Sequence, residues 1–295
     1  MVIDIYSKNH KIDHAMLRLL PLQRCCLSLL LGLGASLFAL QAAAQAVVYR
    51  FGVVPQFEQR QLFATWKPII DELSRRSGVQ LTLTATLSVP EFERELSRGS
   101  FDFVYANPYQ VLREYTRQGY LPLVRDEAPL YGILVVRKDS PYKSPAELEG
   151  LKLAIPSFNA LGASLLLRAD LAQVFKVQMV PVNVKTHSSV YLQVASGQLP
   201  AGGGVEKTLR EQDASVQELL RVLYSTRALP SHPVAAHPRV PPKVRDAITQ
   251  ALLGLANSEA GRQMLGRVPM PKPVVTNMQD YLPMRQWGLD RYWVE

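Results

Sequence analysis

Three places where an expected strand runs into an expected helix carry side chains suited to binding an anion. The first is Asn107-Pro108-Tyr109, after the apolar run Phe101–Tyr105, and the second is the loop 157–162, after the apolar run Leu151–Ile155. The third is Thr186-His187-Ser188-Ser189. The first amides of a helix lack intrahelical acceptors and carry partial positive charge, so they bind anions without a cationic side chain. Each junction alone is typical of a capped helix, whereas the three together indicate a site for a small anion.

Aromatic and amide side chains beside these junctions are further candidate donors. Tyr105 and Tyr109 share the corner "YANPY", and Tyr191 lies one turn into the third helix. Their hydroxyls either reach a ligand or pack into a core, and the sequence favours neither. Asn107 caps its helix, with Pro108 at the first helical position. Gln56 follows the end of the first expected strand, where ligands collect in parallel sheets.

Catalytic motifs are absent from the sequence. It contains no GxSxG, HExxH or GxxxxGK(S/T) motif, and no GxGxxG after an expected strand. His232 and His237 flank "PVAA" with no carboxylate between them, which argues against a metal site. Glu91, Glu93 and Glu95 alternate, and residues two apart do not share a helix face, so a solvated surface is expected. The sequence therefore predicts no enzyme, no catalytic residue, no metal site and no cofactor.

The first 46 residues resemble an export signal rather than part of a fold. Arg18 and Arg24 precede the apolar run Leu27–Leu40, and the small residues of "QAAAQA" suit cleavage after Ala44 or Ala46. The apolar run has 14 residues, fewer than the roughly 20 that span a membrane. We expect a cleaved signal peptide and export to the periplasm, with an uncleaved anchor as the alternative.

The net charge limits the classes of partner that we expect, and both cysteines lie in the predicted signal. Residues 1–15 are polar, which favours Met16 as the true start, and the two cysteines, Cys25 and Cys26, lie at the head of the signal. The net charge is +8, without a dense Lys/Arg run interleaved with aromatics, so nucleic acid is not expected as a partner. A mild positive field favours small anions.

Strands and helices alternate in the first part of the mature chain. Strands are expected at 47–54, 79–86 and 101–105, with helices at 61–76 and 90–98 between them. This order predicts a parallel α/β sheet. One face of the first helix carries apolar residues at helical spacing: Phe63, Trp66, Ile69, Ile70 and Leu73.

A second α/β unit follows the strand Tyr131–Arg137 and ends with the strand Leu219–Thr226. The stretch "LPAGGGVEKTL" predicts a short strand that enters a helix near Val205, and its Gly202–Gly204 predict a tight turn rather than a phosphate loop. Residues 228–242 are Pro-rich, and the rest is expected to be helical, ending with Gln279–Trp293. We predict an α/β protein of two lobes with a hinge between them. Lobe 1 comprises residues 47–134 and 226–295, and lobe 2, residues 135–225, is inserted in it.

Taken in order, segments along nearly the whole mature chain resemble the phosphate/phosphite/phosphonate-binding periplasmic proteins of ABC importers. They are "FGVVPQ", "WKPIIDELSRRSGVQL", "GSFDFVYANPYQVLREY", "YGILVVRKDSPYKSPAELEGLKLAIPS", "THSSVYLQVASGQLPAGGGV" and "LPSHPVAAHPRVPPKVRDAI". The resemblance implies a type II periplasmic-binding fold. It also implies an oxyanion held by the Tyr of "YANPY", the amides after Pro156 and the His of "THSS".

The loop after Pro156 departs from the family pattern, which is rich in Ser and Thr. Ser157 and Asn159 remain polar, but Ala160 and Leu161 cannot donate from their side chains. The lost hydrogen bonds would be worth roughly 1 kcal/mol each. Gly202–Gly204 occupy positions where such proteins often carry an acid for the amine of an aminophosphonate, although Glu206 lies nearby, so aminophosphonate is not favoured.

The resulting expectation is a monomeric transport receptor that closes on a small oxyanion and docks on permease subunits. The alternative is a periplasmic sensing module that reports to a membrane kinase or cyclase, and a hydrolase is the least favoured reading. The predicted ligand-binding residues are Gln56, Tyr105, Asn107, Tyr109, Ser157, Asn159, Ala160, His187, Ser188, Tyr191 and Glu206.

Overall fold

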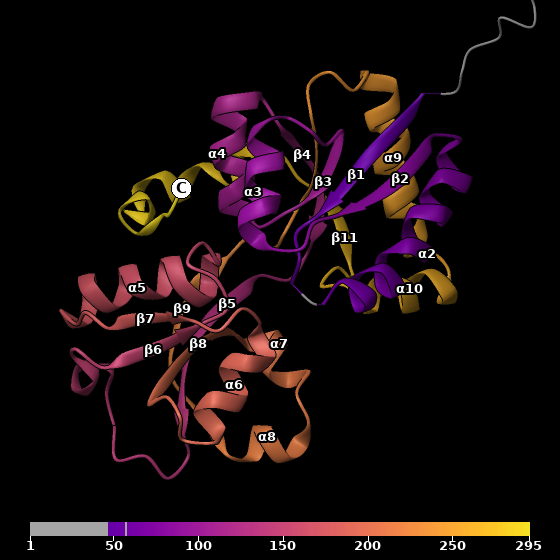
Figure 1. Cartoon of the computed structure of the whole chain (residues 1–295). Helices are drawn as coiled ribbons and strands as arrows, with labels where there is room; N and C mark the ends of the chain where they lie inside the picture. Colours follow the sequence, from indigo (N-terminus) through magenta and orange to yellow (C-terminus); the bar gives the residue numbers. More distant parts are fainter. Residues whose placement is uncertain (1–46, 57) are drawn as a thin grey trace, which may run out of the picture. The chain divides into compact units, whose positions relative to one another are not determined.

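The computed structural model describes residues 47–56 and 58–295 (Figure 1). Val48–Glu295 form one compact unit that contains two separate β-sheets. The predicted signal peptide, residues 1–46, and the start at Met16 lie outside the described residues.

The first sheet has six strands in the order β11-β4-β10-β3-β1-β2. Its strands are β1 (Val48–Val53), β2 (Gln80–Ala85), β3 (Phe103–Tyr105), β4 (Leu121–Asp126), β10 (Val234–Ala236) and β11 (Pro273–Val275). Only β1 pairs in parallel, with β2 and with β3, while β10 runs antiparallel to β3 and β4. The prediction of a parallel sheet was therefore correct for three strands, and the sheet as a whole is mixed.

Strand β10 lies in the middle of the first sheet, although the sequence indicated a Pro-rich loop there. Val234, Ala235 and Ala236 are fully buried between β3 and β4. Proline cannot donate to a ladder, so Pro233 and Pro238 confine this strand to three residues. The position of β10 brings His232, just before it, next to Tyr105 at the end of β3.

The second sheet has five strands in the order β7-β6-β8-β5-β9. Its strands are β5 (Leu130–Arg137), β6 (Lys152–Ile155), β7 (Val180–Asn183), β8 (Ala201–Val205) and β9 (Leu220–Leu229). Strands β6, β7 and β8 pair in parallel, whereas β5 pairs antiparallel to β8 and β9. Both β5 and β9 lie in this sheet; lobe boundaries at 134/135 and 225/226 stay a prediction.

Two groups of helices pack around the first sheet (Figure 1). The helices α2 (Gln59–Ser77), α9 (Pro242–Leu255) and α10 (Glu259–Gly266) contact one another, and α3 (Val89–Ser97) contacts α4 (Pro108–Gln118). In α2 the buried face carries Leu62, Trp66, Ile69, Ile70 and Leu73. Phe63 was expected on this face, but it is 41% exposed because Leu62 takes the inward position one residue earlier.

Helices pack on both faces of the second sheet, and two of them begin at the predicted anion-binding junctions. One continuous helix consists of a π-helical turn η2 (Leu161–Leu166), α5 (Leu167–Asp170) and a second π-helical turn η3 (Leu171–Phe175). On the other face lie α6 (His187–Ala195), α7 (Glu206–Arg210) and α8 (Ala214–Glu218), and η1 (Pro145–Leu148) is a short 3-10 turn (Figure 1).

The helix expected at Gln279–Trp293 forms instead as three short 3-10 turns. These are η4 (Met278–Asp280), η5 (Leu282–Gln286) and η6 (Leu289–Tyr292). Pro283 lies in the first turn of η5, and Gly288 has a positive φ of 68°, a left-handed conformation that interrupts a helix.

Gly202, Gly203 and Gly204 form the middle of strand β8 rather than a turn or a phosphate loop. A Cβ on Gly203 would lie 1.9 Å from the carbonyl oxygen of Ala163, and one on Gly204 would lie 2.2 Å from the Tyr191 hydroxyl. Gly132, on the neighbouring strand, similarly allows the Gly162 carbonyl to approach. The glycines therefore let η2 and α6 lie directly on the sheet.

We expect Gly203→Ala to lower the free energy of unfolding by about 1–3 kcal/mol, because the added methyl must displace helix backbone. Gly266→Ala is the matched control, since a Cβ there meets nothing within 4 Å. Its effect should lie within about 1 kcal/mol and favour folding. Urea denaturation measures both, and equal midpoints for the two variants would contradict the close packing of η2 on β8.

Candidate functional site

A cavity lies among the junctions that the sequence singled out. Its volume is about 80 Å³, several times the roughly 10–15 Å³ that one water requires. It has room for a ligand of several heavy atoms. The polar residues of its lining are Gln56, Asn107, Gln110, Ser157, Asn159, Lys185, Thr186, His187, Lys207, Thr208, Glu211, His232 and Arg267.

The loop 157–162, here called the anion loop, joins β6 to the helix that begins with η2. Five of its six residues, Ser157 and Asn159 to Gly162, line the cavity. The Asn159 amide donates to Ser157 Oγ over 3.4 Å and the Ala160 amide to the Ser157 carbonyl over 3.3 Å. The amides of the first helical turn have no intrahelical acceptor, so this end of η2 offers donors to an anion.

The start of α6 forms a second wall of the cavity. The Thr186 hydroxyl caps the helix by accepting from the Ser189 amide over 3.0 Å. His187, the first helical residue, lies in the cavity lining, and its Nδ1 is 3.4 Å from the Thr208 hydroxyl. Two helix N-termini, those of η2 and α6, therefore meet at one cavity.

His232 joins the site from the first sheet. Its Nε2 lies 3.3 Å from Gln56 Nε2, and its ring stacks on Tyr105 with 5.5 Å between centroids. Burial, and to a lesser extent the nearby His187, lowers the pKa of His232 to about 3, and burial alone lowers the pKa of His187 to about 4. Both imidazoles are thus neutral at pH 7.

Charged side chains at the cavity are mostly cationic. Lys185, Lys207 and Arg267 line it with one carboxylate, Glu211. Lys207 is half-buried, and within residues 47–56 and 58–295 its ammonium donates a single long hydrogen bond of 3.5 Å, to the Val268 carbonyl. Burial lowers the pKa of Lys207 and raises that of Glu211, while each carboxylate–ammonium attraction acts in the opposite direction. A bound anion would compensate the desolvated Lys207 charge.

Of the residues predicted from sequence, six line the cavity: Gln56, Asn107, Ser157, Asn159, Ala160 and His187. The structure places the other five outside its lining. Ser188 is exposed beside His187, and Glu206 pairs with Arg210 on the outer side of α7. The acid that lines the cavity is Glu211, five residues later.

The three tyrosines differ in their surroundings. The Tyr191 hydroxyl lies inside the second lobe, where it accepts from the Val205 amide over 3.1 Å and donates to the Val205 carbonyl over 3.0 Å. Tyr109 packs on Trp293, 5.9 Å between ring centroids. Tyr105 is fully buried behind His232, and its hydroxyl has no hydrogen-bond partner among the described residues. Tyr105 therefore backs the cavity wall rather than lining it.

Sequence reasoning missed Lys207, Thr208, Glu211, His232 and Arg267. His232 was judged only by its spacing from His237, which packs elsewhere, against Tyr120. Lys207 directly follows the predicted Glu206, so the loop-to-helix junction at 205/206 was a usable signal. Within residues 47–56 and 58–295 no cluster of three or more His, Cys, Asp or Glu could hold a metal ion. No helix in this part of the chain is long and apolar enough to cross a membrane.

Residues 51–281 match the family of ABC-transporter phosphonate periplasmic substrate-binding proteins. The match spans well over half of the chain, so the protein belongs to this family. Members bind a substrate for transport, and the family is one of periplasmic proteins.

Solved structures of low sequence identity share the fold. A binding-protein component of an ABC phosphonate transporter from Pseudomonas aeruginosa is 15% identical, with a TM-score of 0.71 over 82% of this chain and 86% of that one. PhnD1 from Prochlorococcus marinus, in complex with methylphosphonate, is 14% identical, with a TM-score of 0.74 over 83% of this chain and 98% of that one. A Xanthomonas citri protein bound to ATP is 18% identical, with a TM-score of 0.68 over 83% of this chain and 98% of that one. The fold is thus the two-lobed type II periplasmic-binding fold, as predicted.

Because both imidazoles are neutral in the folded protein, the free energy of unfolding should fall as the pH is lowered. Between about pH 6.5 and pH 4 the unfolded chain binds protons on His187 and His232 that the folded protein does not, so their contribution to stability is lost as pH falls through this window. We expect the double variant His187→Gln, His232→Gln to lose less stability than the parent between pH 7 and pH 5. Chemical denaturation at both pH values measures this difference, in which the carboxylate contributions cancel. Parallel losses in parent and variant would contradict neutral imidazoles.

Proposed function

We propose that the protein captures a small phosphorus oxyanion, a phosphonate, phosphite or phosphate, in this cavity and delivers it to the permease subunits of an ABC importer. The family match over residues 51–281 carries the proposal and favours transport over sensing. The proposed receptor works as a monomer in the periplasm, after cleavage of a signal peptide within residues 1–46.

The form of the cavity supports a small anionic ligand. Donors converge from the N-termini of η2 and α6, and Lys207 adds a cation with little competition from protein acceptors. A phosphonate has three oxygens that accept several hydrogen bonds each, which suits convergent amide and ammonium donors.

The anion loop also supports a ligand that differs from those of hydroxyl-rich family members. Ala160 and Leu161 supply only backbone donors, and Phe158 is half-buried behind the loop. Lys207 and Thr208 of α7, and Glu211 just after it, also line the cavity and offer alternative contacts. Glu211 also places one carboxylate within reach of a cationic group on the ligand, so aminoalkylphosphonates belong in any ligand panel.

A thermal-shift panel with phosphate, phosphite, methylphosphonate, aminoethylphosphonate and sulfate tests the ligand class. A bound ligand at 100 times its Kd adds about 2.7 kcal/mol to the free energy of unfolding, which raises Tm by a few degrees in a protein of this size.

We expect Lys207→Gln to weaken binding of the best ligand at least tenfold, measured by calorimetry, because the desolvated ammonium is lost. Lys243→Gln, an exposed position at the start of α9, is the charge-matched control. Equal affinities of the two variants would remove Lys207 from the site.

Tyr105 and His187 allow a second test of the same cavity. Tyr105→Phe removes a buried hydroxyl that has no partner in the described residues, so stability should not fall. Because Tyr105 lies behind His232 and does not line the cavity, we expect Tyr105→Phe to bind an oxyanion as the parent does, whereas His187→Ala should weaken binding by removing part of the cavity wall. Calorimetry with the ligand selected by the panel measures both. Parent-like affinity of His187→Ala would show that the oxyanion binds elsewhere.

A further inference from the structure

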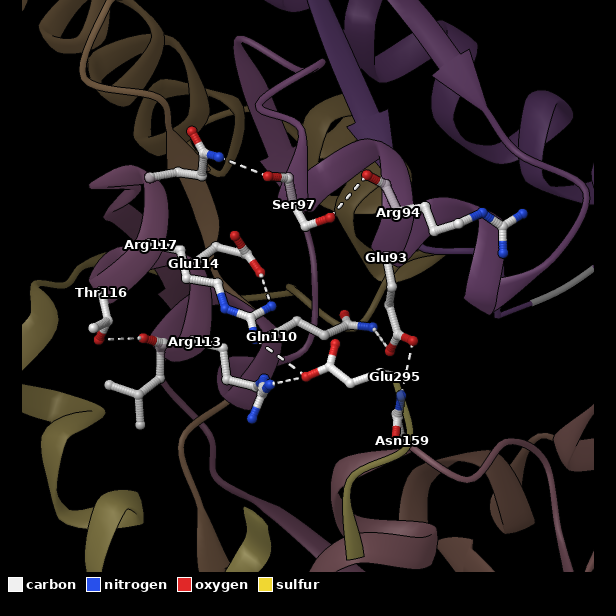
Figure 2. A network of polar contacts seen from close by, with 12 residues as sticks. Glu93, Arg94, Ser97, Gln110, Arg113, Glu114, Thr116, Arg117, Asn159 and Glu295 are labelled. Carbon is white, nitrogen blue, oxygen red and sulfur yellow. Dashed lines mark hydrogen bonds and ion pairs between the residues drawn. The ribbon is translucent and has the colours of Figure 1, made fainter.

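Hydrogen bonds join the anion loop to the first lobe on the side away from the cavity. Figure 2 shows Asn159 and Gln110 both directed at the carboxylate of Glu93, from α3. Asn159 Nδ2 donates to Glu93 Oε2 and Gln110 Nε2 donates to Glu93 Oε1, each over 2.8 Å. A carboxylate with one donor on each oxygen makes strong, directional contacts. Glu93, predicted to be a solvated surface residue, is instead half-buried in this network.

The Asn159 side chain also makes two hydrogen bonds to the backbone of Val294. Its Oδ1 accepts from the Val294 amide over 2.9 Å, and its Nδ2 also donates to the Val294 carbonyl over 2.7 Å. Asn159 is only 4% exposed, and all of these contacts turn its amide away from the cavity. Its backbone stays at the cavity, where its carbonyl accepts from Asn107 Nδ2 over 3.3 Å.

Segment 293–295 is in turn fixed to α4 of the first lobe. The Trp293 ring lies under the Arg113 guanidinium, 4.3 Å from its carbon to the ring centroid. Glu295 pairs with Arg113 over 2.6 Å and with Arg117 over 3.1 Å (Figure 2). Arg113 is well buried, with 16% of its side chain exposed, so this anchor is better shielded from solvent than an ordinary surface ion pair.

The same network reaches the helix that caps the cavity. Gln110, which donates to Glu93, also accepts from the Asn107 amide over 3.1 Å, and Asn107 Oδ1 accepts from the Gln110 amide over 2.9 Å. This reciprocal capping fixes the N-terminus of α4, and both residues line the cavity. The anion loop and the start of α4 are therefore held by one carboxylate.

We propose that Glu93, Asn159 and segment 293–295 form an interlobe latch that sets the position of the anion loop, so that ligand affinity depends on side-chain contacts made outside the cavity. Asn159 is the positioning residue. The latch rests on the proposed function only for its effect on ligand affinity, because its effect on loop opening is a property of the protein alone. Closing the lobes brings the latch groups together, and each latch bond lost shifts the equilibrium toward open forms with a displaced loop.

Hydrogen–deuterium exchange without ligand tests the latch directly. Asn159→Ala and Glu295→Gln should each speed amide exchange in both 157–163 and 289–295, because release of either end frees the other. Glu295 is exposed, so Glu295→Gln tests the coupling from a position that does not threaten folding. Glu95→Gln, on the same helix as Glu93 but outside the network, is the control and should exchange as the parent does. Faster exchange confined to the mutated end would overturn the latch.

Calorimetry with methylphosphonate, alongside exchange, tests the effect on affinity. Asn159→Ala and Glu93→Gln should weaken methylphosphonate about tenfold, the order of one charge-assisted hydrogen bond, and Glu95→Gln should not. Faster exchange in both segments with unchanged affinity would overturn the link from latch to ligand. If the parent itself fails to bind any oxyanion, the proposed function fails, while the exchange data still decide whether the latch exists.

Discussion

The close approach of one helix to two neighbouring strands governs the geometry of the candidate site. Gly203 brings the Ala163 carbonyl onto β8, and Gly132 does the same for the Gly162 carbonyl on β5. With side chains at these positions, η2 would have to lie further from the sheet, and its first amides would leave the cavity. Backbone packing thus decides where the helix N-terminus points, and a helix N-terminus is the least adaptable of anion-binding groups, because its donors move only with the helix.

The second constraint is electrostatic. His187 and His232 come from different lobes, and burial keeps both neutral, so the cavity avoids two adjacent imidazolium charges. The cationic contribution instead comes from Lys207, whose own pKa is lowered by burial. An arriving anion lowers the cost of charge at all three groups.

The sequence predicted the parts of the site that depend on local rules and missed those that depend on pairing across the chain. Helix caps at Asn107 and Thr186 follow from residue type and neighbours, and both lie at the cavity. The position of His232 depends on β10 pairing inside a sheet, and four residues between two prolines do not indicate such a strand. Gly202–Gly204 were ambiguous because glycine suits both a turn and a crowded strand, and only the helix packed above them decides.

Asn159 shows why a polar residue in the right loop need not be a ligand contact. Its position in the anion loop made it a candidate donor, and its backbone does lie at the cavity. Its side chain, however, already bonds to Glu93 and Val294, so turning toward a ligand would leave the half-buried Glu93 carboxylate with one donor fewer. A side chain whose hydrogen-bonding groups are all used in this way cannot turn toward the ligand. It can instead hold the anion loop in the position from which the backbone of the loop reaches the ligand.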